Sequence, residues 1–216
     1  MIIVKFYLVI LVGYLLGSIP FGSIISRRYG KEDIIKHGSG KTGATNALRT
    51  MGRKVAFMVA GLDIFKGALA VLFAGLIVGQ DYLLVGSGYG LGILFAEVLA
   101  GLAAIAGHIF PLFNRLKGGR GVATFFGGLI ALCPAAALFG GEILIIGAGL
   151  SGFASLGSIT GAVGTYAILI PLTIIYGFPV EYLAYTLIGT VVILYMHRDN
   201  IKRLVSGKER RISEKS

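Results

Sequence analysis

Residues 55–79 read VAFMVAGLDIFKGALAVLFAGLIVG, a run of 25 positions with only two charged side chains, Asp63 and Lys66. A helix rises 1.5 Å per residue, so about 20 apolar residues cross the ~30 Å hydrocarbon core of a bilayer. The run therefore predicts a transmembrane helix. Asp63 and Lys66 stand three positions apart on one face of that helix, where we expect them to neutralise each other as a structural pair.

Other parts of the chain show the same apolar character. Four further runs have about the length of one membrane span, at residues 2–25, 83–106, 156–176 and 180–196. A longer block, residues 121–153, is interrupted by Pro134. Of the 216 residues, 56% are hydrophobic and only 14% are charged, against about 25% charged in soluble domains. This composition excludes an ordinary soluble domain and a disordered chain, and it indicates a polytopic membrane protein with one domain over residues 1–216.

The cations predict how the chain crosses the membrane. The net charge is +10, and 18 of the 20 Lys and Arg lie in residues 27–54, 115–120 and 198–215. Cytoplasmic loops concentrate Lys and Arg, so these three segments should share the cytoplasmic side. The chain must then cross an even number of times between the second and third segments. We expect seven transmembrane helices, with the N-terminus outside, the C-terminus cytoplasmic and a turn near Cys133-Pro134; five helices plus a re-entrant hairpin are the alternative.

The first basic segment holds a motif that suits phosphate, HGSGKTGATNALR at residues 37–49. Glycines expose backbone N–H groups, and cations, hydroxyls and an amide stand beside them. The candidate ligands are Gly38, Ser39, Gly40, Asn46 and Arg49. A nucleotide P-loop is excluded because it needs glycine five residues before the Gly-Lys pair, where Ile35 stands. A solvated basic loop without a ligand is the alternative.

The second basic segment, KGGRGVAT at residues 117–124, places glycines and cations where a helix should begin. It is either an anion cradle or a flexible turn with topogenic charges. Its candidates are Lys117, Gly118, Gly119, Arg120 and Gly121. Three more polar residues, Ser155, His197 and Asn200, stand at predicted helix ends, where capping alone would also explain them.

Two further features belong to helix boundaries. The stretch GSIPFG at residues 17–22 predicts a break near the cytoplasmic end of the first helix, because proline removes a backbone hydrogen bond. His108 ends another predicted helix, where we expect an interfacial helix-end residue rather than a catalyst. One cysteine and three histidines leave little for a metal cluster, and we expect no metal site and no cofactor.

Taken together, these motifs resemble the PlsY family of bacterial acyl-phosphate-dependent glycerol-3-phosphate acyltransferases, in the family's order and over nearly the whole chain. The matching pieces are GSIPFG at 17–22, GSG at 38–40, GATN at 43–46, Arg49, Asp63 with Lys66, Gly107-His108, KGGRGVAT at 117–124, SLGSI at 155–159 and HRDNI at 197–201. This chain has Lys41 where the family more often has Asn, and Arg120 where Lys is also common.

The resemblance implies an all-α integral membrane protein with seven transmembrane helices in the bacterial cytoplasmic (inner) membrane and a site that faces the cytoplasm. The implied reaction moves a fatty acyl group from acyl-phosphate to the 1-hydroxyl of glycerol 3-phosphate, giving lysophosphatidic acid and phosphate, as the first step of phospholipid synthesis. Its partners are these two substrates and the lipid bilayer, without nucleic acid, metal, cofactor, acyl-CoA, acyl-carrier protein or an obligatory protein partner.

The resemblance also implies roles for individual residues. Those with a catalytic role would be Ser39, Lys117, His197 and Asn200. Those that bind substrate or phosphate would be Gly38, Gly40, Asn46, Arg49, Gly118, Gly119, Arg120, Gly121 and Ser155.

The expected mechanism relies on charge and alignment. The sequence offers no convincing Ser-His-Asp set and no His-x4-Asp pattern. We therefore expect a substrate phosphate oxygen to accept the hydroxyl proton, while cations and backbone donors align two phosphorylated substrates. A transporter for phosphorylated anions and a CDP-alcohol phosphotransferase are rival interpretations. The first usually shows internal repeats and the second needs clustered aspartates, and the sequence shows neither.

Overall fold

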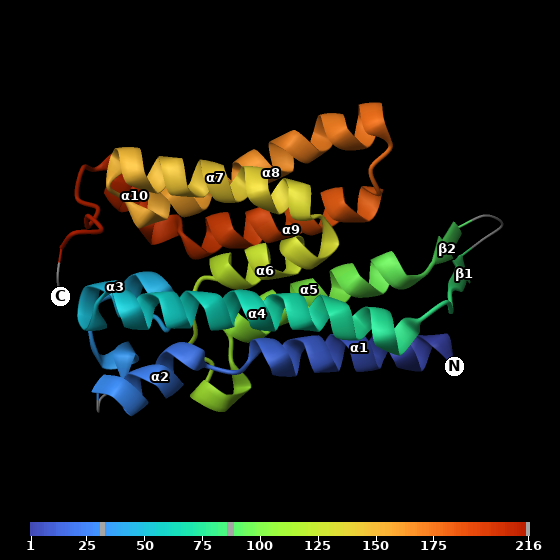
Figure 1. Cartoon of the computed structure of the whole chain (residues 1–216), viewed down its shortest axis with the longest axis horizontal. Helices are drawn as coiled ribbons and strands as arrows, with labels where there is room; N and C mark the ends of the chain where they lie inside the picture. The colour runs from blue at the N-terminus through green and yellow to red at the C-terminus, as the bar shows by residue number, and fades with distance from the viewer. Residues whose placement is uncertain (31–32, 86–88, 215–216) are drawn as a thin grey trace.

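The computed structural model describes residues 1–30, 33–85 and 89–214 and shows a bundle of long helices lying side by side (Figure 1). The helices are α1 Ile2–Gly17, α2 Phe21–Gly30, α3 Ala44–Met51, α4 Arg53–Val78, α5 Ile93–Ile109, α6 Val122–Leu132, α7 Pro134–Ser151, α8 Ala154–Tyr176, α9 Val180–Met196 and α10 Arg198–Val205. Short 3-10 turns form at Ile34–Lys36 and Leu112–Asn114. Lys31 and Lys215, two of the cations from which the topology is predicted, lie outside the described residues.

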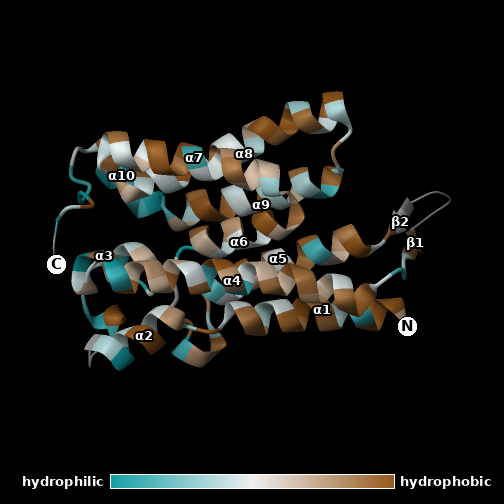
Figure 2. Ribbon diagram, viewed as in Figure 1, coloured by the Kyte–Doolittle hydropathy of each residue, from teal (hydrophilic) through white to brown (hydrophobic). Residues whose placement is uncertain are grey.

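The apolar helices are consistent with an integral membrane protein. Among the described residues, five helical segments, some of them made of consecutive helices, are long and apolar enough to cross a bilayer: Ile2–Tyr29, Arg53–Val78, Ile93–Asn114, Pro134–Ser151 and Ala154–Tyr176. Helices α9 and α10 make a sixth span only if they count as one helix bent by 62°. Hydrophilic residues gather where α2, α3 and α10 share one end of the bundle (Figure 2). The number of crossings and the side that this end faces stay predictions.

The long apolar block divides where the sequence predicts. Helix α6 ends at Leu132 and α7 begins at Pro134, beyond Cys133. Proline fits the first turn of a helix because its missing N–H has no intrahelical partner there. Helix α7 runs back past α6 and packs along α8 (Figure 1). The predicted turn at Cys133-Pro134 is confirmed.

The predicted helix over residues 83–106 is wrong at its start. Strands β1 (Leu83–Val85) and β2 (Tyr89–Leu91) pair antiparallel, with Leu83 opposite Leu91, and α5 begins only at Ile93. Glycines occupy every second position from 86 to 92. Glycine loses the most backbone freedom in a helix and favours turns, which outweighs the apolar composition of this stretch. Residues 86–88 lie outside the described part of the chain.

The first run breaks in two, as the GSIPFG stretch predicts. Helix α1 ends at Gly17, and α2 begins at Phe21, after Pro20. The Lys66 ammonium of α4 donates a hydrogen bond to the Ile19 carbonyl oxygen over 2.9 Å. A polar backbone group inside a membrane protein needs such a partner. The break in one helix is therefore stabilised by a charged side chain of another.

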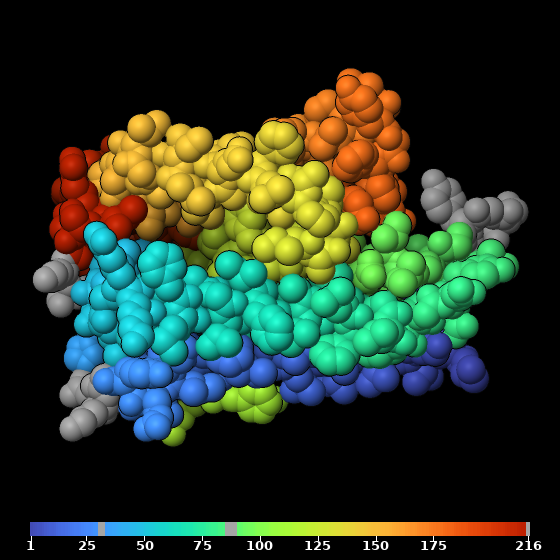
Figure 3. Space-filling model, in the orientation of Figure 1, coloured from blue at the N-terminus to red at the C-terminus, as the bar shows by residue number. Residues whose placement is uncertain are grey.

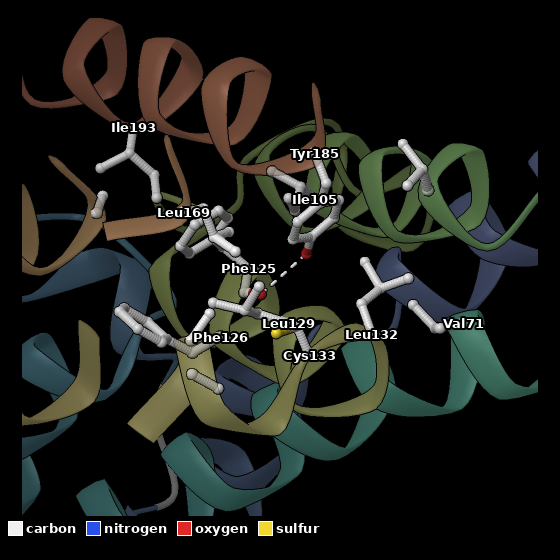
Figure 4. Packing of buried hydrophobic residues seen from close by; sticks show 14 of the residues in the cluster. Val71, Ile105, Phe125, Phe126, Leu129, Leu132, Cys133, Leu169, Tyr185 and Ile193 are labelled. Atoms are coloured by element: carbon white, nitrogen blue, oxygen red, sulfur yellow. Dashed lines mark hydrogen bonds between the residues drawn. The ribbon is translucent and has the colours of Figure 1, made fainter. Parts of the chain in front are cut away.

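The largest group of buried hydrophobic residues surrounds α6 (Figure 4). The Tyr185 ring of α9 stacks on Phe125 of α6, with centroids 5.4 Å apart, and its hydroxyl donates to the Phe125 carbonyl oxygen over 2.9 Å. Helix α6 also packs against α4, α5 and α7. This core fixes α6, and with it the glycine-rich loop that leads into its N-terminus.

Candidate active site

A cavity of about 390 Å³ is lined by residues of the first two basic segments and of α4, α6, α7 and α8. Figure 3 shows α6 recessed between the surfaces of α4 and α7. One part of the lining is polar and includes Ser39, Lys41, Arg120 and His197. The other part is apolar and comes mainly from α6 and α7. The cavity therefore joins a charged chamber to a groove among apolar helices.

A second cavity, of about 300 Å³, extends the charged chamber towards the C-terminal segment. It shares Ser39, Lys41 and Arg120 with the first. Together the two cavities are lined by nine of the predicted site residues: Gly38, Ser39, Asn46, Arg49, Gly119, Arg120, Gly121, His197 and Asn200. Residues of all three basic segments therefore line these two cavities.

Asn46 shapes the first loop from within. Its side-chain oxygen accepts from the Ser39 amide over 2.9 Å, and its side-chain nitrogen donates to the carbonyl oxygens of Ile34, His37 and Lys41 over 2.9–3.1 Å. The side chain is buried, and both ends of its amide bond to the loop itself. Asn46 thus positions the loop that presents Ser39, and direct contact between Asn46 and a phosphate stays a prediction.

The glycines of the second loop permit close packing on His108. The Gly119 amide donates to the His108 carbonyl oxygen over 3.1 Å. A Cβ atom at Gly118 would overlap that carbonyl group, and one at Gly119 would overlap the His108 ring. The Gly119 amide is therefore used for packing within the protein. Arg120, which lines both cavities, brings the positive charge of this loop to the chamber.

Lys117 lies apart from this chamber. Its side chain is exposed and lines a separate cavity of about 450 Å³, with Arg27 and Arg115 among its neighbours. The Asn114 side chain donates to the Lys117 carbonyl oxygen over 2.7 Å and so fixes the backbone of the turn. Contact between Lys117 and a substrate stays a prediction, as does any ligand role for Gly40 and Gly118.

Glu209 organises the C-terminal side of the chamber. Its carboxylate accepts hydrogen bonds from Ser155 over 3.0 Å, Asn200 over 2.7 Å and Arg203 over 2.7 Å. Burial raises the pKa of Glu209, but these hydrogen bonds more than offset that effect and hold the pKa below its usual value. No sequence motif points to Glu209; the only signal is a single carboxylate inside the basic run of residues 208–211.

A second buried carboxylate, Asp63, lies on the other side of the glycine-rich loop. Its oxygen is 2.8 Å from the Lys66 ammonium and 3.4 Å from His108 Nδ1. The predicted Asp63–Lys66 pair is confirmed, and His108 stands near the end of α5 as predicted. Asp63 and His108 also line the first cavity, of about 390 Å³, and so form part of the chamber wall.

His197 is placed to accept a hydrogen bond inside the chamber. It follows α9 directly, and its Nδ1 is 2.8 Å from the Ile193 carbonyl oxygen, which can only accept. Nδ1 therefore carries the proton, and Nε2 is left with a lone pair. Burial, reinforced by the positive charge of Arg120, lowers the pKa of His197 to about 4. The imidazole is thus neutral near pH 7.

The chamber has more positive than negative charge. Burial lowers the pKa of Lys41, and the cations Arg120 and Arg198 lower it further. The guanidinium Nε atoms of Arg49 and Arg120 are buried and make no hydrogen bond within the described part of the protein. A buried unsatisfied donor costs about 1–3 kcal/mol, and more when charged. Anionic oxygens would satisfy these donors, so the arrangement suits phosphorylated ligands.

Known proteins resemble this chain over nearly its whole length. A family model described as glycerol-3-phosphate acyltransferase matches residues 7–207. Glycerol-3-phosphate acyltransferase 3 of Dehalococcoides mccartyi is 66% identical over 216 residues, with 100% of both chains covered. The glycerol-3-phosphate acyltransferase of Thermus thermophilus is 40% identical over 207 residues, covering 96% of this chain and 95% of that protein.

Solved structures of an integral membrane glycerol 3-phosphate acyltransferase, PlsY (YgiH), share the fold. Its glycerol 3-phosphate form matches with a TM-score of 0.81 at 35% identity, and its lysophosphatidic acid form with 0.77 at 34%. Both matches cover 95% of this chain and 94% of the other. From the helical bundle, the cation-rich chamber and these matches it follows that the chain belongs to the glycerol-3-phosphate acyltransferase family, as an integral membrane acyltransferase of the PlsY type.

Proposed function

We propose that the acyl donor is an acyl-phosphate, and that the chain transfers its acyl group to the 1-hydroxyl of glycerol 3-phosphate as the first step of phospholipid synthesis. One observation carries this proposal: the cation-rich chamber and the apolar groove form a single cavity. A molecule with a phosphate head directly attached to a fatty acyl tail matches both parts at once. PlsY (YgiH) has been crystallised with glycerol 3-phosphate and with lysophosphatidic acid, the acceptor and the product of such a transfer.

The charge of the chamber supports two phosphorylated substrates. The smaller cavity is lined by six cations and two carboxylates: Lys41, Arg49, Arg120, Arg198, Arg203, Arg210, Asp199 and Glu209. Two phosphates held close together repel each other unless cations stand between and around them. We assign Arg49 and Arg120 to this role because their buried Nε atoms have unused hydrogen-bonding capacity among the described residues.

The transfer step needs alignment more than a strong base. The 1-hydroxyl oxygen attacks the acyl carbon, and the bond from that carbon to the phosphate oxygen breaks. Phosphate leaves with the bonding electrons, and the hydroxyl proton passes to a phosphate oxygen. His197, a weak base with a pKa of about 4, would orient the hydroxyl through Nε2 rather than retain its proton. Ser39 and the Arg120 guanidinium would stabilise charge that develops in the transition state.

The remaining assignments concern Asn200, Ser155 and Lys117. Asn200 lines the chamber and binds Glu209, and its side-chain oxygen is buried without a hydrogen-bond partner in the described structure. Ser155 binds the same carboxylate. We assign both to positioning of the C-terminal side of the chamber. Lys117 would attract anionic substrates from the exposed side of the glycine-rich turn.

The decisive experiment supplies purified protein with palmitoyl-phosphate and glycerol 3-phosphate in detergent, and follows lysophosphatidic acid and inorganic phosphate. We expect both products in equal amounts, and we expect the activity to survive EDTA. Parallel reactions contain palmitoyl-CoA or a palmitoylated acyl-carrier protein. If only those donors give lysophosphatidic acid, the acyl-phosphate proposal is wrong.

The membrane arrangement is tested separately. We propose seven crossings of the bacterial inner membrane, with the chamber on the cytoplasmic side. The single cysteine, Cys133, is buried, so single-cysteine variants can be built on Cys133→Ala. Cysteines at Ser39 and Glu214 should react with an impermeant maleimide only in inside-out vesicles, and one at Tyr82 only in right-side-out cells. Labelling of Ser39 and Glu214 from opposite sides would refute this arrangement.

A further inference from the structure

We infer that Gly141 of α7 determines how long an acyl chain the groove accepts. The inference rests on the proposed acyl-phosphate reaction and adds a specificity-determining residue to it. The observation behind it is a glycine in the middle of a helix that faces the groove, at a position where nothing in the packing of the bundle requires glycine.

One face of α7 forms a wall of the groove. Ala137, Gly141, Leu144, Ile145 and Ala148 line the cavity, and their spacing of three or four residues places them on the same side of the helix. From Ala148, near the polar chamber, to Ala137, the wall is about 16 Å long at 1.5 Å per residue. This length is comparable with an extended fatty acyl chain, and Gly141 lies in its deeper half.

The opposite wall comes from α6. Phe126 and Ile130 line the cavity, one turn of helix apart. A side chain added at Gly141 would project into the space between the two helices, where it would meet this wall. The chamber lies beyond Ala148, towards His197, so such a side chain would leave the reacting end of the substrate untouched.

Two other glycines of α7, Gly140 and Gly147, have a packing reason that Gly141 lacks. A Cβ atom at Gly140 would overlap Thr165 Oγ1 of α8, and one at Gly147 would stand 2.6 Å from Thr160 Oγ1. At Gly141 no heavy atom lies within 4 Å of that position. Glycine inside a helix costs about 0.5–1 kcal/mol relative to alanine. Helix packing explains Gly140 and Gly147, whereas the open space beside Gly141 is part of the groove.

Gly149 provides a matched control. It lies on the same helix, it too has no heavy atom within 4 Å of a Cβ position, and it is exposed outside the cavity. The variants Gly141→Leu and Gly149→Leu therefore add the same atoms to the same helix and raise its intrinsic helix propensity equally. They differ in whether the new side chain enters the groove.

The experiment measures kcat/KM for decanoyl-, lauroyl-, myristoyl-, palmitoyl- and stearoyl-phosphate, and divides each value by that of the wild type. This ratio cancels differences in the solubility of the donors. For Gly141→Leu we expect the ratio for palmitoyl- and stearoyl-phosphate to fall at least ~10-fold below the ratio for decanoyl-phosphate, a size typical of excluding one or more methylenes. The KM for glycerol 3-phosphate should stay within about twofold of the wild type, and Gly149→Leu should give a flat profile.

The outcomes separate this inference from the proposed function. If the wild type uses no acyl-phosphate, the proposed function fails. If the wild type does, but Gly141→Leu gives a flat ratio across the donors, the inference about Gly141 is wrong. Should Gly141→Leu fail to fold, Gly141→Ala is measured instead: a fall confined to the longest donors supports the inference, and a flat profile overturns it.

Discussion

Two buried carboxylates stand on either side of the charged chamber, and they are assembled in opposite ways. Asp63 takes Lys66 from its own helix, one turn away, and His108 from the neighbouring α5. Glu209 instead takes its partners from two other helices: Ser155 of α8, and Asn200 and Arg203 of α10.

Their surroundings also differ. The side chains of Asp63, Lys66 and His108 are only 2–4% exposed, among apolar helices. Glu209 is buried too, but its partner Arg203 is 40% exposed. Leaving a charge unpaired therefore costs far more free energy beside Asp63 than beside Glu209. We therefore expect Asp63 to contribute mainly to the stability of the bundle, and Glu209 mainly to the alignment of the site.

The largest expected effect is on the Asp63 side. Asp63→Leu leaves the Lys66 ammonium buried without its carboxylate, which should destabilise the protein by about 3–5 kcal/mol. Thermal unfolding in detergent measures this change. The double variant Asp63→Leu/Lys66→Met removes both charges and should recover more than half of the loss. An unchanged unfolding temperature for the single variant would contradict a structural role for the pair.

The second prediction concerns the loop between the two carboxylates. Arg120→Gln removes a cation that lines both cavities and should lower kcat/KM by about 10²-fold or more. Lys117→Gln should stay within about fivefold of the wild type, because exposed charges contribute about 1 kcal/mol or less. Steady-state kinetics with palmitoyl-phosphate compares them. A larger loss for Lys117 than for Arg120 would place the catalytic charge on the other side of the turn.

The third prediction tests whether Glu209 mainly aligns the site. Glu209→Gln weakens charge-assisted hydrogen bonds, each worth about 1.5–3 kcal/mol, so we expect a smaller loss of stability than for Asp63→Leu. The KM for glycerol 3-phosphate should rise about tenfold, the equivalent of ~1.4 kcal/mol. Glu214→Gln, an exposed carboxylate on the same tail, is the control and should change neither quantity. Complete unfolding of Glu209→Gln would erase the contrast with Asp63.

The fourth prediction is a pH dependence of stability from His197. Its pKa is about 4 when folded and near 6.5 when exposed, so the unfolded state binds more protons between these values. The stability that the neutral His197 contributes is complete above pH 6.5 and is lost as the pH falls towards 4. From pH 7 to pH 5 the wild type should lose about 2 kcal/mol more than His197→Gln. Unfolding midpoints of both proteins at the two pH values measure it, and equal shifts would place the titration elsewhere.

The same contrast explains how far the sequence could predict the structure. The Asp63–Lys66 pair is readable because it is local: two charges at helical spacing inside an apolar run leave few other arrangements. The helix break at Pro20 and the turn at Pro134 are readable for the same reason. The strands at residues 83–85 and 89–91 are not predicted, because hydrophobicity alone does not weigh the four glycines in this apolar stretch.

The site was predictable in its residue types but less so in its contacts. The glycine-rich motifs identify the loops that gather at the chamber, yet they do not show that Asn46 bonds to its own loop or that Gly119 packs on His108. The contacts of Glu209 could not be predicted from the sequence, for a physical reason. Its partners lie up to 54 positions away, and only tertiary packing brings a tail carboxylate to Ser155.

The tail that carries Glu209 has a consequence for biogenesis. Arg49 donates to the carbonyl oxygens of Arg210 and Arg211, and the Ile212 amide donates to the Gly152 carbonyl oxygen. Residues 209–212 leave the ribosome after every described long helix has been made. A nascent polypeptide halted behind α9 would thus hold its membrane segments but lack one wall of its catalytic compartment. We therefore expect turnover to begin only when translation has passed this point, so that an incompletely synthesised copy does not consume lipid precursors.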